Sequence, residues 1–358
     1  MAYTTIDDPS AHFQIKLYSG NSTNNTAITN DGNSDLQPDW IWAKSRTNTH
    51  YHDLRDSTRG VTKRLVSNEA DTESTKDQSY VSFDSDGFTL GDDTDSGGSA
   101  LNTINTSSNN YVAWQWKANG GTTSSNSSGT NITSTVQANT TAGFSIVTFT
   151  GTGNDGDSYG HGLTSAPELV IPKRRDGTSN WQGYAFDGGN SQYWYLNLTN
   201  AFANTTGNSA ASSSSVITTD ASGDSNPSGG TVVSYCFHSV KGYSKIGRYS
   251  SNGNADGPFI YTGFKPAWVM IKRTDASQSW NINDTTRDPE NPSDLRILAD
   301  SGGAEEDRAD TDAIDFLSNG FKIRSTATIL NASGGTYIYM AFAEHPFVSS
   351  EGVPVTAR

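Results

Sequence analysis

Two histidines at alternate positions are the first residues whose types suit metal binding. His50 and His52 flank Tyr51, and on a strand residues i and i+2 face the same side, where two imidazoles can share one ion. No third ligand follows at a spacing typical of a metal site. The acidic stretch beginning with Asp84 and Asp86 offers carboxylate oxygens for calcium but lacks the glycine and closing glutamate of a known calcium loop. We keep these four side chains as candidate metal ligands and predict no cofactor.

Aromatic residues indicate a second kind of site, one that binds sugars. The string QYWYLNL contains Tyr193, Trp194 and Tyr195, and Trp181 lies shortly upstream. Flat rings offer apolar faces to the C–H groups of a glycan and polar tips to its hydroxyls. The alternative interpretation is that Trp194 belongs to the core while its neighbours face solvent, because other strands of the chain are equally aromatic.

The sequence contains no arrangement typical of a catalytic centre. His161 in YGHGL has no G-x-S-x-G nucleophile elbow beside it. Glycosidase chemistry needs two facing carboxylates, and none of the many Asp and Glu residues in polar turns is distinguished as such a pair. We therefore predict that the chain is not an enzyme and that His161 is a hydrogen-bonded turn residue.

The elements that would position these residues recur along the chain. Three segments open on a proline, continue with apolar residues and close on a lysine, which is typical of a strand that starts with proline. They are PDWIWAKSR from Pro38, PELVIPKRR from Pro167 and PAWVMIKR from Pro266, with Lys44, Lys173 and Lys272 as the lysines. Related strings precede each segment, and an apolar run such as YIYMAFA ends each unit, so the sequence predicts an internal repeat.

The predicted fold class is all-β, with three internally repeated antiparallel β-sandwich units of jelly-roll or lectin-like topology. The units span residues 13–117, 144–238 and 239–347, between a lead at 1–12 and a tail at 348–358. Residues 118–143 contain almost no large apolar side chain, which predicts a polar linker or surface excursion. One short helix is predicted in DTDAIDFLSNG, where Ala313, Ile314 and Leu317 share a helical face.

Composition excludes several classes of protein. The net charge of −14 argues against a nucleic-acid surface. No apolar stretch approaches the length of a membrane span, and the chain starts without a signal peptide, so we expect neither membrane insertion nor export. The single cysteine, Cys236, lies in the apolar run VVSYCFH, which predicts a buried free thiol.

An Asp-x-x-Arg string occurs in the first and third units, in DSTRG and DTTRD. Asp56 and Arg59 therefore match Asp284 and Arg287, and we interpret each pair as a turn held by a charge-assisted hydrogen bond. The second unit lacks this string.

Several long strings resemble a family of repeat proteins encoded in the structural gene modules of tailed bacteriophages, many of them marine. The strings include GNSDLQPDWIWAKSR, TRGVTKRL, ANTTAGFSIVTFTGTG, ADGPFIYTGFKPAWVMIKR and LNASGGTYIYMAFAEHPF, and the resemblance covers nearly the whole chain. It implies a virion component, often of a tail fibre or another surface appendage, and it carries no assigned catalytic residues.

This resemblance sets the functional expectation. We expect a non-enzymatic virion surface protein, made in the host cytoplasm, that contacts other virion proteins and engages host cell-surface polysaccharide. A homo-oligomer such as a trimer is expected, although three units in one chain also suit a pseudo-threefold monomer. The alternative is a purely architectural part, such as a capsid decoration, head-fibre or tail adaptor protein.

Overall fold

The chain folds into antiparallel β-sheets, and the computed structural model describes residues 3–96, 101, 103–187, 190–205, 210–309 and 311–355. Helical structure among these residues is short. It consists of two 3-10 turns and one α-helix, at Pro9–Ala11, Thr94–Ser96 and α1 (Thr328–Asn331).

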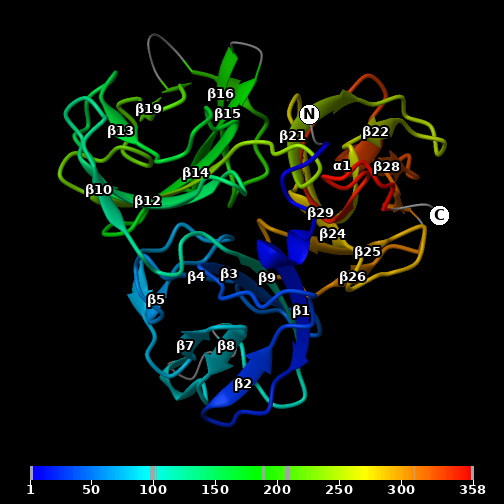
Figure 1. Ribbon diagram of the computed structural model, residues 1–358, viewed down its shortest axis with the longest axis horizontal. Coiled ribbons are helices and arrows are strands. Elements are labelled where there is room, and N and C mark those ends of the chain that lie inside the picture. The colour runs from blue at the N-terminus through cyan, green and yellow to red at the C-terminus, as the bar shows by residue number, and fades with distance from the viewer. Residues whose placement is uncertain are drawn as a thin grey trace.

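Three large sheets lie around the centre of the molecule (Figure 1). In spatial order, the first contains β1 (Phe13–Ser19), β9 (Asn110–Trp116), β3 (Trp40–Ser45) and β4 (Asp53–Asp56). The second contains β10 (Ser124–Asn126), β11 (Ser134–Asn139), β12 (Phe144–Thr150), β20 (Thr231–Phe237), β14 (Leu169–Arg174), β15 (Gln182–Asp187), β16 (Asn190–Tyr195) and β17 (Ala203–Asn204). The third contains β21 (Ser244–Ser250), β29 (Thr336–Pro346), β23 (Phe264–Arg273), β24 (Asn281–Asp284), β25 (Leu295–Leu298) and β26 (Glu306–Asp307).

Each large sheet packs against a small sheet that lies toward the periphery in Figure 1, and we call the two together a sheet pair. The small sheet of the first pair contains β2 (Thr26–Thr29), β8 (Gly87–Leu90) and β7 (Tyr80–Asp84). That of the second contains β13 (Ser158–Gly160), β19 (Val216–Thr218) and β18 (Ala211–Ser212), and that of the third β22 (Phe259–Tyr261), β28 (Gly320–Ile323) and β27 (Ile314–Leu317). A two-stranded ribbon, β5 (Lys63–Arg64) with β6 (Ser74–Thr75), adjoins the first pair.

The large sheets are buried on both faces. Along β3, Trp40 and Trp42 point into a cluster shared by all three large sheets, whereas Ile41 and Ala43 point toward the small sheet of the same pair. This follows from the alternation of side chains along a strand. A strand covered on both faces needs apolar residues at every position, which explains the continuous apolar runs in the sequence.

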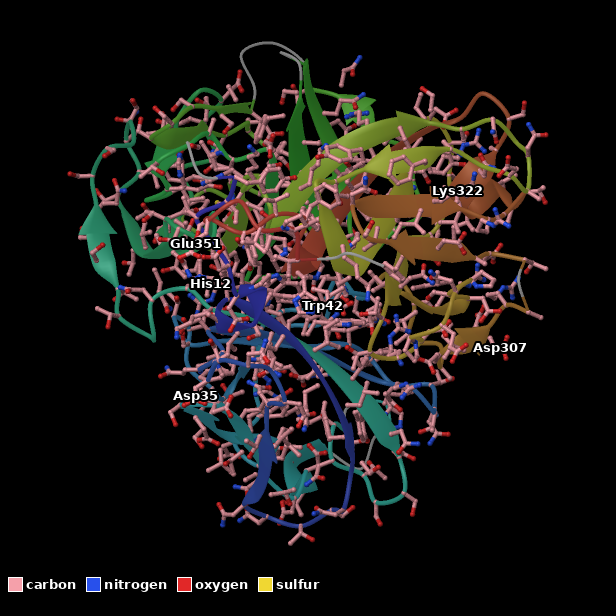
Figure 2. All side chains as sticks on the ribbon, turned by 45° about the vertical axis from the view of Figure 1, so that its right-hand side comes forward. His12, Asp35, Trp42, Asp307, Lys322 and Glu351 are labelled. Atoms are coloured by element: carbon pink, nitrogen blue, oxygen red, sulfur yellow. The ribbon has the colours of Figure 1, made fainter. Side chains whose placement is uncertain are left out.

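All eight tryptophans of the chain lie in the shared cluster, which we call the tryptophan core. Phe13, Tyr235 and Phe342 join it from the three different sheets. Figure 2 shows Trp42 near the middle of the molecule, while Asp35 and Asp307 point outward. The tryptophan core therefore joins the three sheet pairs into one body.

The structure confirms the three proline-to-lysine segments as strands β3, β14 and β23, and it places β29 inside its sheet, between β21 and β23, with both faces covered. The helix predicted around Ala313 is wrong. Residues Ile314–Leu317 form β27, which pairs with β28 through a two-residue turn, Ser318–Asn319. The alternation of buried Ile314 and Phe316 with half-buried neighbours favours the strand.

The segment 118–143, predicted as a polar linker, holds strands β10 and β11. Ile132 and Val136 are buried in the core of the second pair, and β11 pairs with β12 along its whole length. Two apolar side chains and a complete hydrogen-bond ladder order this segment despite its polar composition.

Candidate functional site

His52 is a buried, fully hydrogen-bonded residue. Its Nδ1 accepts a hydrogen bond from Trp42 Nε1 at 2.7 Å, and its Nε2 lies 3.0 Å from the carbonyl oxygen of Leu298. Burial lowers the pKa of His52 to about 3, so the ring is neutral and Nε2 donates. His50 Nδ1 in turn lies 3.1 Å from a backbone carbonyl oxygen. This geometry corrects the predicted histidine pair, because His52 has no free nitrogen for a metal ion.

Asp84 and Asp86 lie at the hairpin between β7 and β8. The Asp84 carboxylate accepts hydrogen bonds from the hydroxyls of Ser82 and Thr89 at 2.6 and 2.7 Å, and Asp86 accepts one from the Leu36 N–H at 3.2 Å. Within the described part of the chain, no three His, Cys, Asp or Glu side chains gather as a metal-binding group. Both carboxylates therefore stabilise a turn.

The predicted platform of four rings is wrong for its two tryptophans. Trp181 and Trp194 have no exposed surface and belong to the tryptophan core. Tyr193 and Tyr195 point to the other face of β16 and are half-buried, with ring centres 5.9 Å apart. Alternation along the strand separates the four rings, and only the two tyrosines keep contact with solvent.

The structure confirms the predictions for His161, as a hydrogen-bonded turn residue, and for Cys236, as a buried free thiol. His161 is buried, with Nε2 3.1 Å from the Ser213 carbonyl oxygen, while Nδ1 accepts from the Leu163 N–H at 3.1 Å. Cys236 is a buried free thiol, and burial raises its pKa to about 12. Burial keeps the Cys236 thiol protonated at neutral pH. His161 is neutral, but both of its ring nitrogens are engaged by the backbone.

The three lysines of the recurring segments are fully buried. Lys173 Nζ donates to the carbonyl oxygens of Ser179 at 2.7 Å and of Ala70, in the first sheet pair, at 3.2 Å. Lys272 Nζ donates to the Thr199 carbonyl oxygen, in the second pair, at 3.1 Å. Burial lowers the pKa of Lys173 and Lys272 to about 8 and that of Lys44 to about 7. Lys44 Nζ donates to the Ser45 carbonyl oxygen and interacts electrostatically with Glu305 of the third pair. Each lysine thus lies where one sheet pair meets the next.

The Asp-x-x-Arg turns also lie between sheet pairs. Arg59 Nε binds Asp56, and Asp56 accepts a hydrogen bond from the hydroxyl of Tyr235 in the second pair at 2.7 Å. Arg59 further contacts Glu73 at 2.9 Å, and Glu73 binds Arg175 of the second pair at 2.8 Å. The predicted turn is confirmed, but it is one part of a buried network that joins two sheet pairs.

The turn in the third pair repeats this network toward the first. Arg287 binds Asp284, which accepts from Trp114 Nε1 at 3.0 Å. Arg287 also contacts Glu305 at 3.0 Å, and Glu305 binds Arg46 of the first pair at 2.8 Å. We call these two networks the ionic junctions.

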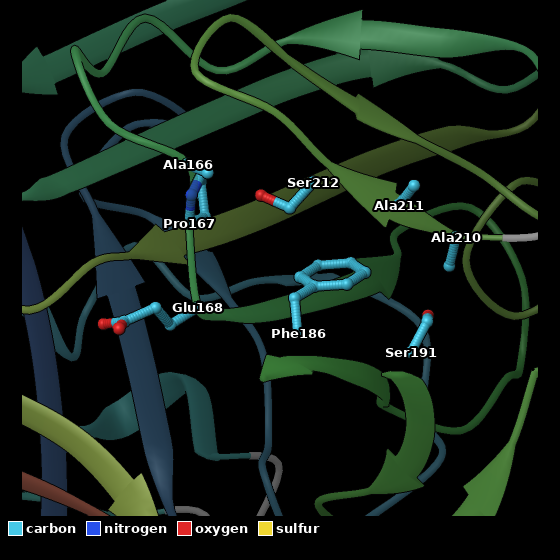
Figure 3. Close-up of a pocket in the computed structure, with 8 residues that line it drawn as sticks. All are labelled: Ala166, Pro167, Glu168, Phe186, Ser191, Ala210, Ala211 and Ser212. Atoms are coloured by element: carbon cyan, nitrogen blue, oxygen red, sulfur yellow. The ribbon is translucent and has the colours of Figure 1, made fainter. Parts of the chain in front are cut away.

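A pocket of about 260 Å³ lies between the two sheets of the second pair (Figure 3). Its lining residues are Ala166, Pro167, Glu168, Phe186, Ser191, Ala210, Ala211 and Ser212. The Phe186 ring is half-buried, and the hydroxyl oxygens of Ser191 and Ser212 have no hydrogen-bond partner. Figure 3 shows the Glu168 carboxylate pointing away from the Phe186 ring.

Sequence reasoning missed the partners of the ionic junctions and the residues of this pocket. Glu73 and Glu305 carry no local motif, and their partners lie far away along the chain. Phe186 had a signal, because it belongs to a strand next to the aromatic string around Trp194. Ser212, in a serine-rich stretch, had none.

Among the described residues no helix is long and apolar enough to cross a bilayer. No curated protein and no solved structure matches the chain. One family model matches residues 8–346, almost the full length, and its description is a domain of unknown function. The chain therefore belongs to the DUF7483 family.

Proposed function

We propose that this chain is a non-enzymatic surface protein of a tailed bacteriophage virion and that it engages host glycans. The virion assignment rests on the long sequence strings that resemble phage structural proteins. The binding role rests on a body that is rigidly joined at its centre and carries polar loops outside, such as those around Asp35 and Asp307 in Figure 2.

We further propose that the three sheet pairs are copies of one sandwich unit arranged around a pseudo-threefold axis. One set of contacts carries this proposal. The residue just before β4, β15 or β24 donates a side-chain hydrogen bond to a carbonyl oxygen of the preceding pair in cyclic order. The three bonds are His52 to Leu298, Trp181 to Val66 and Trp280 to Tyr195, at 3.0, 2.7 and 2.9 Å. Matching donors at matching positions are expected of a repeated unit.

Two measurements test the functional proposal. Mass spectrometry of purified phage particles, together with antibody labelling of those particles in electron micrographs, is expected to find the chain on the surface. A glycan array probed with the full chain is expected to show binding to neutral bacterial polysaccharides. Absence of the chain from particles contradicts the virion assignment, and an empty array contradicts host-glycan engagement.

A purely architectural role is the second candidate. One observation favours it: Trp181 and Trp194, the strongest sugar-stacking candidates of the sequence, are buried inside the chain. A capsid decoration or tail adaptor protein would be found in particles and would give an empty array.

A further inference from the structure

The pocket of the second sheet pair exists because a serine stands where the other two pairs have phenylalanine. In each small sheet, a buried residue of the middle strand faces one residue on the outer strand. Phe88 faces Phe83 in the first pair and Phe321 faces Phe316 in the third. In the second pair, Ile217 faces Ser212. The register thus assigns Ser212 the position that an aromatic ring fills twice elsewhere.

The missing ring leaves space above another aromatic residue. Phe186, on β15, forms one wall of the pocket, and Ala211 and Ser212 lie across from its ring in Figure 3. Ala166 and Ala211 are exposed, so the space opens to solvent. In the other two pairs, Phe83 and Phe316 pack against the cores between their sheets.

We propose that this pocket binds one ring of a neutral sugar, and this inference rests on the proposed engagement of glycans. A pyranose presents a flat C–H face that packs on an aromatic ring, which Phe186 supplies. The volume of 260 Å³ lies just below the range of about 300–1,000 Å³ typical of pockets for drug-sized ligands. A single sugar ring therefore suits this pocket better than a longer segment of chain.

The polar groups at the pocket match the hydroxyls of a sugar. Ser191 and Ser212 each have a buried hydroxyl oxygen without a partner, although buried polar groups are nearly always hydrogen-bonded. A serine hydroxyl can donate one hydrogen bond and accept two, and rotation about its Cβ–Oγ bond aims the hydrogen at a ligand. A bound sugar supplies the partners that the protein does not.

The charges exclude anionic ligands. Glu168 is the one charged residue among the described residues that line the pocket, and the whole chain carries a net charge of −14. A uronate or a phosphorylated sugar meets repulsion here, with no Lys or Arg among the described lining residues to offset it. The predicted ligand is therefore a neutral hexose or N-acetylhexosamine at the end of a glycan.

Saturation-transfer NMR on the full chain tests this site. The probes are the methyl glycosides of glucose, galactose, mannose and N-acetylglucosamine, with glucuronate as the charged comparison. We expect transfer to at least one neutral glycoside and none to glucuronate. Ser212→Phe restores the ring of the other two pairs and fills the pocket, so it is expected to abolish the signal without lowering Tm. Phe186→Leu is expected to weaken binding by about threefold to tenfold.

Ser214→Phe is the matched control, because Ser214 is exposed in the turn between β18 and β19 and does not line the pocket. It is expected to retain the signal. An undiminished signal in Ser212→Phe overturns the site. Binding of the chain to a glycan array without transfer to any of the four glycosides also overturns it, but leaves the proposed function standing. An empty array, with no transfer to any glycoside, overturns both the site and the proposed engagement of glycans, whereas the virion assignment keeps its own test.

Discussion

Two junctions of the molecule share a backbone hydrogen bond but differ in the side chains around it. One joins the first sheet pair to the second, and the other joins the second to the third. At the first of these, the Glu73 N–H donates to the Arg175 carbonyl oxygen at 2.9 Å. At the second, the Phe202 N–H donates to the Thr274 carbonyl oxygen, also at 2.9 Å. A glutamate and an arginine in one junction thus correspond to a phenylalanine and a threonine in the other.

The remaining members of the ionic network change as well. Trp40 and Leu169 are each the second residue after the opening proline of their segment. Asp56 pairs with Trp40 in the first sheet, whereas Ala185 pairs with Leu169 in the second. Met270 and Ile171 are likewise each the fourth residue after their prolines. Met340 pairs with Met270 in the third sheet, and Tyr235 pairs with Ile171 in the second, so Met340 and Tyr235 occupy matching positions. The resulting aromatic junction consists of Trp194, Phe202 and Trp280, with the two tryptophan rings 4.6 Å apart.

The buried carboxylate–arginine sets at these junctions are therefore either complete or absent. A carboxylate taken out of water without partners costs several kcal/mol, roughly. The ionic junctions satisfy Asp56 and Asp284 with an arginine and a neutral donor each. Met340 stands where Tyr235 donates in the ionic junction, and its thioether has no hydrogen to donate. An aspartate at position 185 would therefore lack one of its partners, and alanine stands there instead.

The largest expected effect comes from breaking one ionic junction. Arg59→Met leaves Asp56 buried with Tyr235 as its remaining side-chain partner, and we expect the free energy of unfolding to fall by about 3–5 kcal/mol. Arg287→Met is expected to cost a similar amount at the other ionic junction. Urea denaturation followed by tryptophan fluorescence measures both.

A combined variant sharpens this comparison. Asp56→Ala, Arg59→Met, Glu73→Phe, Arg175→Thr and Tyr235→Met together give the first junction the chemistry of the aromatic one. We expect this variant to be more stable than Arg59→Met alone, since it leaves no unpaired charge. A loss below about 1 kcal/mol in the single variant would show that the network contributes little.

A smaller effect is expected at the aromatic junction. Trp280→Phe removes the hydrogen bond to the Tyr195 carbonyl oxygen and part of the ring contact with Trp194 and Phe202. We expect a loss of about 2 kcal/mol, because the hydrogen bond and part of the contact with two neighbouring rings are lost together. Trp181→Phe, which removes the equivalent bond to Val66 at an ionic junction, is the matched control. It should cost less, about 1 kcal/mol, and an equal loss would argue that ring packing does not distinguish the junctions.

Local patterns allowed the strands of this fold to be predicted. The segments from Pro38, Pro167 and Pro266 have the β-branched and aromatic content of buried strands, and each became a central or near-central strand. The Asp-x-x-Arg turn was also predictable, because its hydrogen bonds span three residues.

Contacts between distant segments were not predictable. Asp56 and Tyr235 are 179 positions apart, and nothing local to either residue indicates the other. The orientation of Trp194 was equally hidden, because alternation does not distinguish the two faces of a strand when both are buried. The same limit applies to the pocket, since the role of Ser212 is visible only in the register of β18 against β19.

The smallest expected effect concerns the lysines, which all three junctions share. The pKa of Lys44 is about 7 in the folded chain, below its ordinary value of 10.5, because burial disfavours the ammonium. The unfolded state therefore binds more protons than the folded state between about pH 7 and 10, and stability rises with pH in that window. For Lys44 alone this amounts to about 1 kcal/mol between pH 7 and 8.

The variant Lys44→Met tests this. We compare its unfolding free energy with that of the unmodified chain at pH 7 and again at pH 8. The advantage of the methionine should shrink by about 1 kcal/mol over that step. Lys272→Met, at the aromatic junction, should show a smaller change, because the pKa of Lys272 is about 8 and most of its proton loss follows at higher pH. Equal changes in unfolding free energy at the two sites would mean that the two junctions bury their lysines to the same degree. If the difference for Lys44→Met does not depend on pH, the Lys44 ammonium stays charged over this range and must be in contact with solvent.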